Sequence, residues 1–192
     1  MKKDIILAGV GGQGILSIAT VIGEAALNEG LHIKQAEVHG MSQRGGDVQS
    51  NLRISSSEIH SDLIAKGGAD LVLSLEPMEA LRYKSFLAPD GWIVTHSVPF
   101  ENIPNYPPID AVLDELKAFG RTILVDVDAI AKEAGNPRGA NMVLLGACAH
   151  LLGLGSEKFE DGIARIFQRK GTEVVEMNIN AFRAGAAAAA KE

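Results

Sequence analysis

The stretch Asp4-Ile5-Ile6-Leu7-Ala8-Gly9-Val10-Gly11-Gly12-Gln13-Gly14, with the apolar run of residues 15–27 behind it, decides the fold class of this chain. Residues 4–8 form a short apolar segment that ends at glycines, which is typical of a buried strand. The following run has a helical period, which places on one face Leu16, Ala19, Thr20, Gly23 and Leu27. The sequence therefore begins with a predicted strand, a tight turn and a helix.

The rest of the chain repeats this alternation and then becomes helical. Strand patterns occupy residues 32–38, 71–75, 92–95 and 122–125, with a weaker extended segment at 48–54. Helical patterns occupy residues 78–87, 110–119, 141–154, 157–168 and 174–190. We therefore expect one three-layer α/β/α, Rossmann-like domain over residues 1–192, with a helical C-terminal part. Its sheet should be largely parallel, with segment 47–60 as the place for antiparallel additions.

The composition fits an ordinary soluble globular protein. Of 192 residues, 46% are hydrophobic and 22% are charged, and the net charge of −6 argues against broad binding to nucleic acid or anionic lipid. Residues 5–23 are uncharged and imitate a signal peptide or membrane span, but glycines interrupt the apolar run where such a segment should be continuous. We expect a cytoplasmic protein with no membrane segment.

The side chains that most often carry redox or metal chemistry are sparse. Cys148 is the single cysteine, so the chain cannot supply the four thiolates of an ordinary iron–sulfur cluster, and its apolar surroundings indicate a buried residue without a role. The histidines show no metal-ligand spacing, and we expect no metal. Asp126 and Asp128 follow a predicted strand, where helix capping is favoured over paired-carboxylate catalysis. We predict no catalytic residue in this chain.

The first candidate binding element is the glycine turn, which satisfies the pattern G-x-G-x-x-G between a predicted strand and a predicted helix. Such a turn brings backbone N–H groups close to a ligand, and the N-terminus of the helix favours an anion. Its candidate residues are Gly9, Gly11, Gly12, Gln13 and Gly14. An equally good interpretation is that these glycines only make a tight crossing from strand to helix. Glu37, which ends the second predicted strand, would suit the ribose of a nicotinamide dinucleotide and keeps that alternative open.

The second candidate element is the loop His39-Gly40-Met41-Ser42-Gln43-Arg44-Gly45-Gly46. Arg44 and the backbone donors of Gly45 and Gly46 suit a phosphate or carboxylate, and Ser42 and Gln43 add neutral hydrogen bonds. The alternative is that this loop braces the glycine turn or a partner subunit.

With these two loops, most of the chain resembles the gamma-type domain of pyruvate and other 2-oxoacid ferredoxin oxidoreductases. The glycine turn corresponds to the opening motif of the family, and Arg44-Gly45-Gly46 with Val48, Ser50 and Arg53 is similar to its second signature. The loop from His39 to Gly46 is similar to that of the separate small subunit in the indolepyruvate branch. A less specific match is the turn of residues 136–142 before a helix, which contains Asn141.

The resemblance implies that this chain is the small subunit of an enzyme that oxidatively decarboxylates a 2-oxoacid, such as indolepyruvate, to an acyl-CoA. Thiamine diphosphate, Mg²⁺ and [4Fe-4S] clusters are then expected on a larger partner subunit, with ferredoxin as the electron acceptor and coenzyme A as co-substrate. The chain would carry no cofactor of its own and would be inactive alone. Its isolated form could be a homodimer. The alternatives are a self-sufficient NAD(P)-linked oxidoreductase and a non-enzymatic nucleotide-binding interaction domain.

Overall fold

A computed structural model of the chain describes residues 1–39, 45–101 and 103–190. Its strands are β1 (Lys2–Val10), β2 (His32–His39), β3 (Asp47–Ser55), β4 (Ala69–Ser74), β5 (Leu87–His96) and β6 (Thr122–Val125). Its α-helices are α1 (Ile15–Asn28), α2 (Pro77–Arg82), α3 (Ile109–Ala118), α4 (Val127–Glu133), α5 (Ala140–Cys148), α6 (Ser156–Phe167) and α7 (Thr172–Ala189). Three short 3-10 turns follow α2, α5 and α6, at Lys84–Phe86, Ala149–Leu151 and Gln168–Lys170.

The strands form one mixed sheet in the order β2-β3-β1-β4-β5-β6. Neighbours β1, β4, β5 and β6 pair in parallel, whereas β3 pairs antiparallel with both β1 and β2. The predicted α/β class and largely parallel sheet are confirmed, and the antiparallel addition is β3, within the segment where it was expected. Because β3 lies between them, β1 and β2 run in the same direction without touching.

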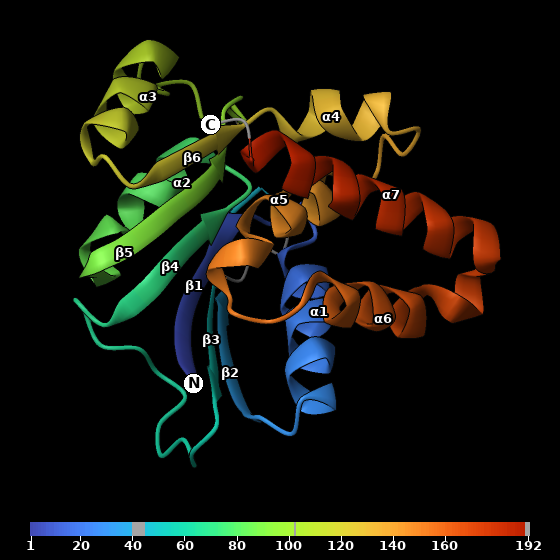
Figure 1. Cartoon of the computed structure of the whole chain (residues 1–192). Helices are drawn as coiled ribbons and strands as arrows, with labels where there is room; N and C mark the ends of the chain where they lie inside the picture. The colour runs from blue at the N-terminus through green and yellow to red at the C-terminus, as the bar shows by residue number, and fades with distance from the viewer. Residues whose placement is uncertain (40–44, 102, 191–192) are drawn as a thin grey trace.

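Helices cover both faces of this sheet, which gives three layers (Figure 1). One face packs against α1 and α4–α7 in the larger core cluster, which contains Leu7, Ile18, Leu144, Phe159 and Phe182. The other face packs against α2 and α3 in a smaller cluster around Ile6, Val72 and Leu116. The helical C-terminal part is therefore the cover of one sheet face. Within the described residues, no helix has both the length and the apolar character that a membrane span requires.

Most of the α1 face given by the sequence pattern is exposed, and only Ala19 of that face is buried. Leu16 and Leu27 are 45% and 59% exposed, and Thr20 is exposed too. The helix instead buries the residues Ile15, Ile18, Ala19, Val21, Ile22, Ala25 and Ala26. Nearly every position of α1 is apolar or small, so its periodicity allows two faces and packing against the sheet selects one.

Two predicted helices are shorter than expected. The helix expected over residues 78–87 ends at Arg82, because a 3-10 turn follows and Leu87 already belongs to β5. The helix expected over residues 141–154 ends at Cys148 and continues only as a 3-10 turn. Strand β5 in turn starts five residues before the predicted Trp92, since Gly91 allows it to approach Ala69 closely: a Cβ at Gly91 would lie 2.8 Å from the Ala69 carbonyl oxygen.

Candidate functional site

The glycine turn joins the carboxyl end of β1 to the first turn of α1. Gly12 and Gly14 have φ angles of +105° and +88°, which L-residues with a side chain rarely adopt. Gly9 is needed for a different reason, because a Cβ there would lie 2.8 Å from the Gln13 side-chain oxygen. Gly12 is exposed and has open space around it, so among the predicted turn residues it is the one most accessible to a ligand.

Gln13, predicted as a ligand contact, uses its side-chain amide inside the protein. Its Oε1 accepts a hydrogen bond from the Val10 N–H at 2.7 Å, and its Nε2 donates to the Leu75 carbonyl oxygen at 3.0 Å. Leu75 follows β4, so the amide ties the glycine turn to the neighbouring strand. The geometry therefore gives Gln13 a bracing role, and Gly9, which is buried, shares it.

The two loops selected from the sequence meet in space. The Gly11 N–H donates to the Gly46 carbonyl oxygen at 2.8 Å, and the Gly45 N–H donates to the Gly11 carbonyl oxygen at 3.4 Å. These bonds extend the β1–β3 pairing by one step beyond Val10 and Asp47. Both backbone groups of Gly11 are thereby engaged, and the two loops are joined at this residue. Ser42, Gln43 and Arg44 lie outside the described residues.

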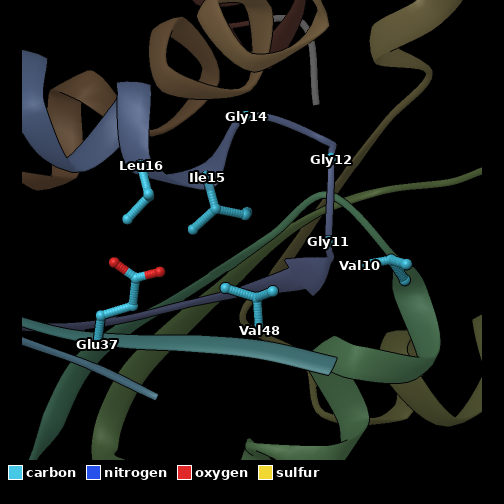
Figure 2. A pocket seen from close by; sticks show the side chains of 8 residues that line it. All are labelled: Val10, Gly11, Gly12, Gly14, Ile15, Leu16, Glu37 and Val48. Carbon is cyan, nitrogen blue, oxygen red and sulfur yellow. The ribbon is translucent and has the colours of Figure 1, made fainter. Parts of the chain in front are cut away.

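A hollow of about 400 Å³ lies beside the turn, in the size range of small-ligand sites. Figure 2 shows its lining residues, which come from β1, the glycine turn, α1, β2 and β3. The Glu37 carboxylate points toward the first turn of α1, near the exposed side chain of Leu16. Among the described lining residues Glu37 carries the only formal charge, so the hollow suits an apolar group with a hydrogen-bond donor at its mouth.

The N-terminus of α1 has no side-chain cap, which favours binding of an anion there. Its N-cap is Gly14, which provides no side-chain hydrogen bond, and the first turn contains no acidic residue. Uncapped N–H groups at a helix N-terminus favour a negatively charged partner. The Asn141 Nδ2 group donates to the Gly14 carbonyl oxygen at 3.4 Å, which brings the start of α5 to the same place. The turn of residues 136–142, whose match to the family is less specific, therefore lies at this site.

The position of Glu37 differs from that of an ordinary dinucleotide-binding unit. There, the acidic residue ends a strand that directly neighbours the glycine-turn strand. Here β3 separates β2 from β1, which displaces Glu37 by one strand spacing of about 4.8 Å. The geometry therefore argues against the nicotinamide interpretation of Glu37.

Two residues of the second signature belong to the scaffold. Ser50 is fully buried and accepts a hydrogen bond from the Gln35 side chain at 3.0 Å. Arg53 forms a two-pronged ion pair with Asp4, at 2.7 and 3.0 Å, near the amino end of β1. Six residues of extended strand, about 20 Å, separate Asp4 from Val10 at the glycine turn. The second signature is continuous in sequence, but its residues lie at both ends of the sheet: Gly45 and Gly46 contact the glycine turn, and Arg53 lies near the amino end of β1.

The remaining candidate residues lie apart from the turn. Cys148 is buried as predicted, and burial raises the pKa of its thiol well above the usual range. Asp126 caps α4 by accepting a hydrogen bond from the Ala129 N–H at 3.0 Å, which confirms the capping prediction. His96 is buried at the end of β5, with Nε2 3.4 Å from Asp128. In the part of the chain that the structure describes, no three His, Cys, Asp or Glu side chains gather into a possible metal site.

Comparison with known proteins identifies the family. The sequence model described as pyruvate ferredoxin/flavodoxin oxidoreductase matches residues 4–188. The chain belongs to this family. It is 35% identical to the indolepyruvate oxidoreductase subunit IorB of Methanothermobacter thermautotrophicus, over 100% of both chains.

Two solved structures share the fold. One is the gamma subunit of a keto/oxoacid ferredoxin oxidoreductase from Geobacter sulfurreducens, with 27% identity, a TM-score of 0.71 and 99% of each chain covered. The other is the 2-oxoglutarate:ferredoxin oxidoreductase of Magnetococcus marinus, with 2-oxoglutarate, coenzyme A and succinyl-CoA bound. That match has 24% identity and a TM-score of 0.79, and covers all of this chain but 31% of the longer one.

Proposed function

We propose that this family member is the small, gamma-type subunit of an indolepyruvate:ferredoxin oxidoreductase, with residues 1–192 as a single domain. The observation that carries the proposal is the end-to-end match to an indolepyruvate oxidoreductase subunit at 35% identity. With a larger subunit, the enzyme would oxidatively decarboxylate an aryl 2-oxoacid to its acyl-CoA and reduce ferredoxin, in the cytoplasm. The chain is a subunit of an oxidoreductase, and its own part is to bind and orient.

The division of cofactors follows from the donor groups. Thiamine diphosphate, Mg²⁺ and [4Fe-4S] clusters belong on the larger subunit in this proposal. A [4Fe-4S] cluster needs four thiolates, whereas this chain has one cysteine, which is fully buried within α5. The chain's residues therefore do not fit a cluster, and the isolated chain should be inactive.

The site assigned to this chain is the edge where the two loops meet. The exposed Gly12, the uncapped start of α1 and Arg44 beside Gly45 would hold phosphate groups of coenzyme A. The hollow next to Leu16 and Glu37 would accept a less charged part of the same molecule. The alternative for the same residues is packing against the larger subunit. Both the KM for coenzyme A and the Kd between the subunits are therefore measured.

The test is reconstitution of the chain with its larger subunit. We expect ferredoxin reduction only when both subunits and coenzyme A are present, with a higher kcat/KM for indolepyruvate and phenylpyruvate than for pyruvate or 2-oxoglutarate. Tight NAD(P) binding and nicotinamide reduction by the isolated chain would support the self-sufficient oxidoreductase instead. Absence of turnover with every 2-oxoacid in the assembled complex would favour a non-enzymatic interaction domain.

The Arg44→Ala variant tests the site itself. Loss of one charge-assisted hydrogen bond should raise the KM for coenzyme A, or the Kd between subunits, by roughly 10-fold or more. Arg121→Ala is the matched control, because Arg121 is exposed and precedes β6 at the opposite edge of the sheet. If Arg44→Ala changes neither constant more than the control does, the assignment of the second loop is wrong.

A further inference from the structure

A hydrogen-bonded network lies on the side of the glycine turn that faces away from the hollow. Asp47 begins β3, directly after Gly45 and Gly46, and pairs with Val10 across the strands. Its Oδ2 accepts a hydrogen bond of 2.7 Å from the Tyr83 hydroxyl group at the end of α2. Since Val48 lines the hollow on the α1 side, the alternation of strand side chains turns Asp47 toward α2.

Tyr83 is held in place by its own surroundings. Its side chain belongs to the smaller core cluster, and the residue is only 8% exposed. One helical turn earlier, Glu79 is 5% exposed and accepts hydrogen bonds from Arg82 Nε and Nη2 at 2.7 and 3.2 Å. Burial raises the pKa of the Tyr83 hydroxyl, and the bond to Asp47 raises it further. The hydroxyl therefore remains a donor at every pH at which the enzyme would work.

The backbone connects Asp47 to the glycine turn, where the ligand is proposed to bind. Asp47 is covalently continuous with Gly46, whose carbonyl oxygen accepts from Gly11 at 2.8 Å, and Gly45 bonds back to Gly11 at 3.4 Å. Fixing the Asp47 side chain therefore fixes the start of β3 against the glycine turn. Gly45 and Gly46 are the described candidate residues of the second loop, and their position against the turn depends on the same anchor.

We propose that Tyr83 and Asp47 are positioning residues that hold Gly45 and Gly46 against the glycine turn for binding of the coenzyme A phosphates at that turn. The inference rests on the proposed function, because it needs coenzyme A at that turn. Neither side chain lines the hollow, and neither is assigned a contact with the ligand. Their effect on affinity would pass through backbone geometry, where displacement of a bound group by a fraction of an ångström weakens charge-assisted hydrogen bonds.

The experiment measures steady-state constants of the reconstituted two-subunit enzyme. Tyr83→Phe keeps the buried ring and removes only the hydroxyl group, and we expect the KM for coenzyme A to rise about 10-fold, the effect of losing one hydrogen bond of about 1.4 kcal/mol. The KM for the 2-oxoacid and the kcat at saturating coenzyme A should stay within twofold. Asp47→Asn keeps an acceptor for Tyr83 and should restore most of the affinity that Asp47→Ala loses.

The matched control is Tyr106→Phe. Tyr106 also donates its hydroxyl group to a carboxylate at this edge, that of Glu76, but it has no bond to β3. We expect Tyr106→Phe to lower the Tm while leaving the KM for coenzyme A unchanged. The double variant Tyr83→Phe/Asp47→Ala should lose no more affinity than the more severe single variant, because both changes break the same bond.

The outcomes are distinct. If Tyr83→Phe and Tyr106→Phe shift the KM for coenzyme A equally, in proportion to their loss of Tm, the network is structural only and the inference fails. If Tyr83→Phe does not fold, Asp47→Ala carries the same test, because Asp47 is exposed. If Arg44→Ala raises the KM for coenzyme A but Tyr83→Phe does not, the positioning role is wrong and the proposed site stands. If neither variant changes it, the proposed site itself is wrong.

Discussion

Replacement of Arg53 by methionine should strongly destabilise the fold without touching the candidate site. Arg53 Nε and Nη2 bond to the two carboxylate oxygens of Asp4 at 2.7 and 3.0 Å, and Nη1 donates to the carbonyl oxygens of Ser61 and Leu63. The side chains of Arg53 and Asp4 are 17% and 3% exposed. Arg53→Met keeps most of the aliphatic stem but leaves a buried carboxylate without its main partner.

The expected loss of unfolding free energy depends on which partners Asp4 keeps in the Arg53→Met variant. Removing one partner of a buried ion pair costs about 3–5 kcal/mol. Lys2 Nζ stays 2.9 Å from the carboxylate, although its side chain is 61% exposed, so we expect the lower end of that range, about 3 kcal/mol. For a chain of this length, this cost corresponds to a fall in Tm of roughly 6–12 °C. The exposed pair of Lys2 with Asp4 is worth at most about 1 kcal/mol, which makes Lys2→Met the matched control.

The assay is urea unfolding of both variants and the natural chain at several pH values. Burial raises the pKa of Asp4, but the bonds to Arg53 and Lys2 outweigh it and hold the pKa below its ordinary value of 3.8. This carboxylate therefore stabilises the fold above pH 3.8, and the contribution is lost as the pH falls through the lowered pKa. Without Arg53 the pKa should rise, so the difference in unfolding free energy between the natural chain and Arg53→Met should shrink with acidification. A cost equal to that of Lys2→Met, or a difference that stays constant down to pH 3, would refute the reasoning.

Three further predictions concern the helical layer. Gly146→Ala should lower the free energy of unfolding by about 1–3 kcal/mol, because a Cβ at Gly146 would lie 1.9 Å from the Phe182 carbonyl oxygen where α5 crosses α7. Gly23→Ala in α1 should raise the free energy of unfolding by roughly 0.5–1 kcal/mol, since the new Cβ would meet only Ile33, at an ordinary 3.7 Å. Urea unfolding of both variants measures the contrast, and a change of the same sign in both would contradict the prediction. Cys148 should react with a disulfide reagent at pH 8 far more slowly in the folded chain than in urea, because it is fully buried and burial raises the pKa of its thiol. Equal rates in the two states would show that the thiol is accessible.

Much of the architecture could be predicted because its elements are strongly patterned. A buried parallel strand such as β4 appears as a continuous apolar run, and the change from a strand period to a helical one marks β1 and α1. The end of α2 could not be predicted in this way. The helical pattern continues to Leu87, but the tertiary pairing of Leu87 with Ala69 places that residue in β5, and the intervening Lys84–Phe86 form a 3-10 turn.

The candidate site was predictable in its composition but not in its connections. The glycines between the first strand and helix predict a tight turn, and in the structure Gly12 and Gly14 make it with positive φ angles. The hydrogen bonds from Gln13 to Val10 and Leu75, and the approach of Asn141 to Gly14, depend on packing between segments that are up to 127 residues apart. The sequence pattern places Leu16 on a helical face, and only the fold shows that it lines the hollow.

Strand β3 gives a common physical cause for the ways in which this turn departs from a dinucleotide site. By pairing antiparallel with β1, it brings Gly46 within 2.8 Å of the Gly11 N–H, so a donor that a pyrophosphate would otherwise use is already bonded. By lying between β1 and β2, it moves Glu37 one strand away from the position of a ribose-binding acid. By starting directly after Gly45 and Gly46, it attaches the second loop to the first. The same glycine spacing can therefore serve two chemistries, and the strand inserted beside it decides which donors stay free for a ligand.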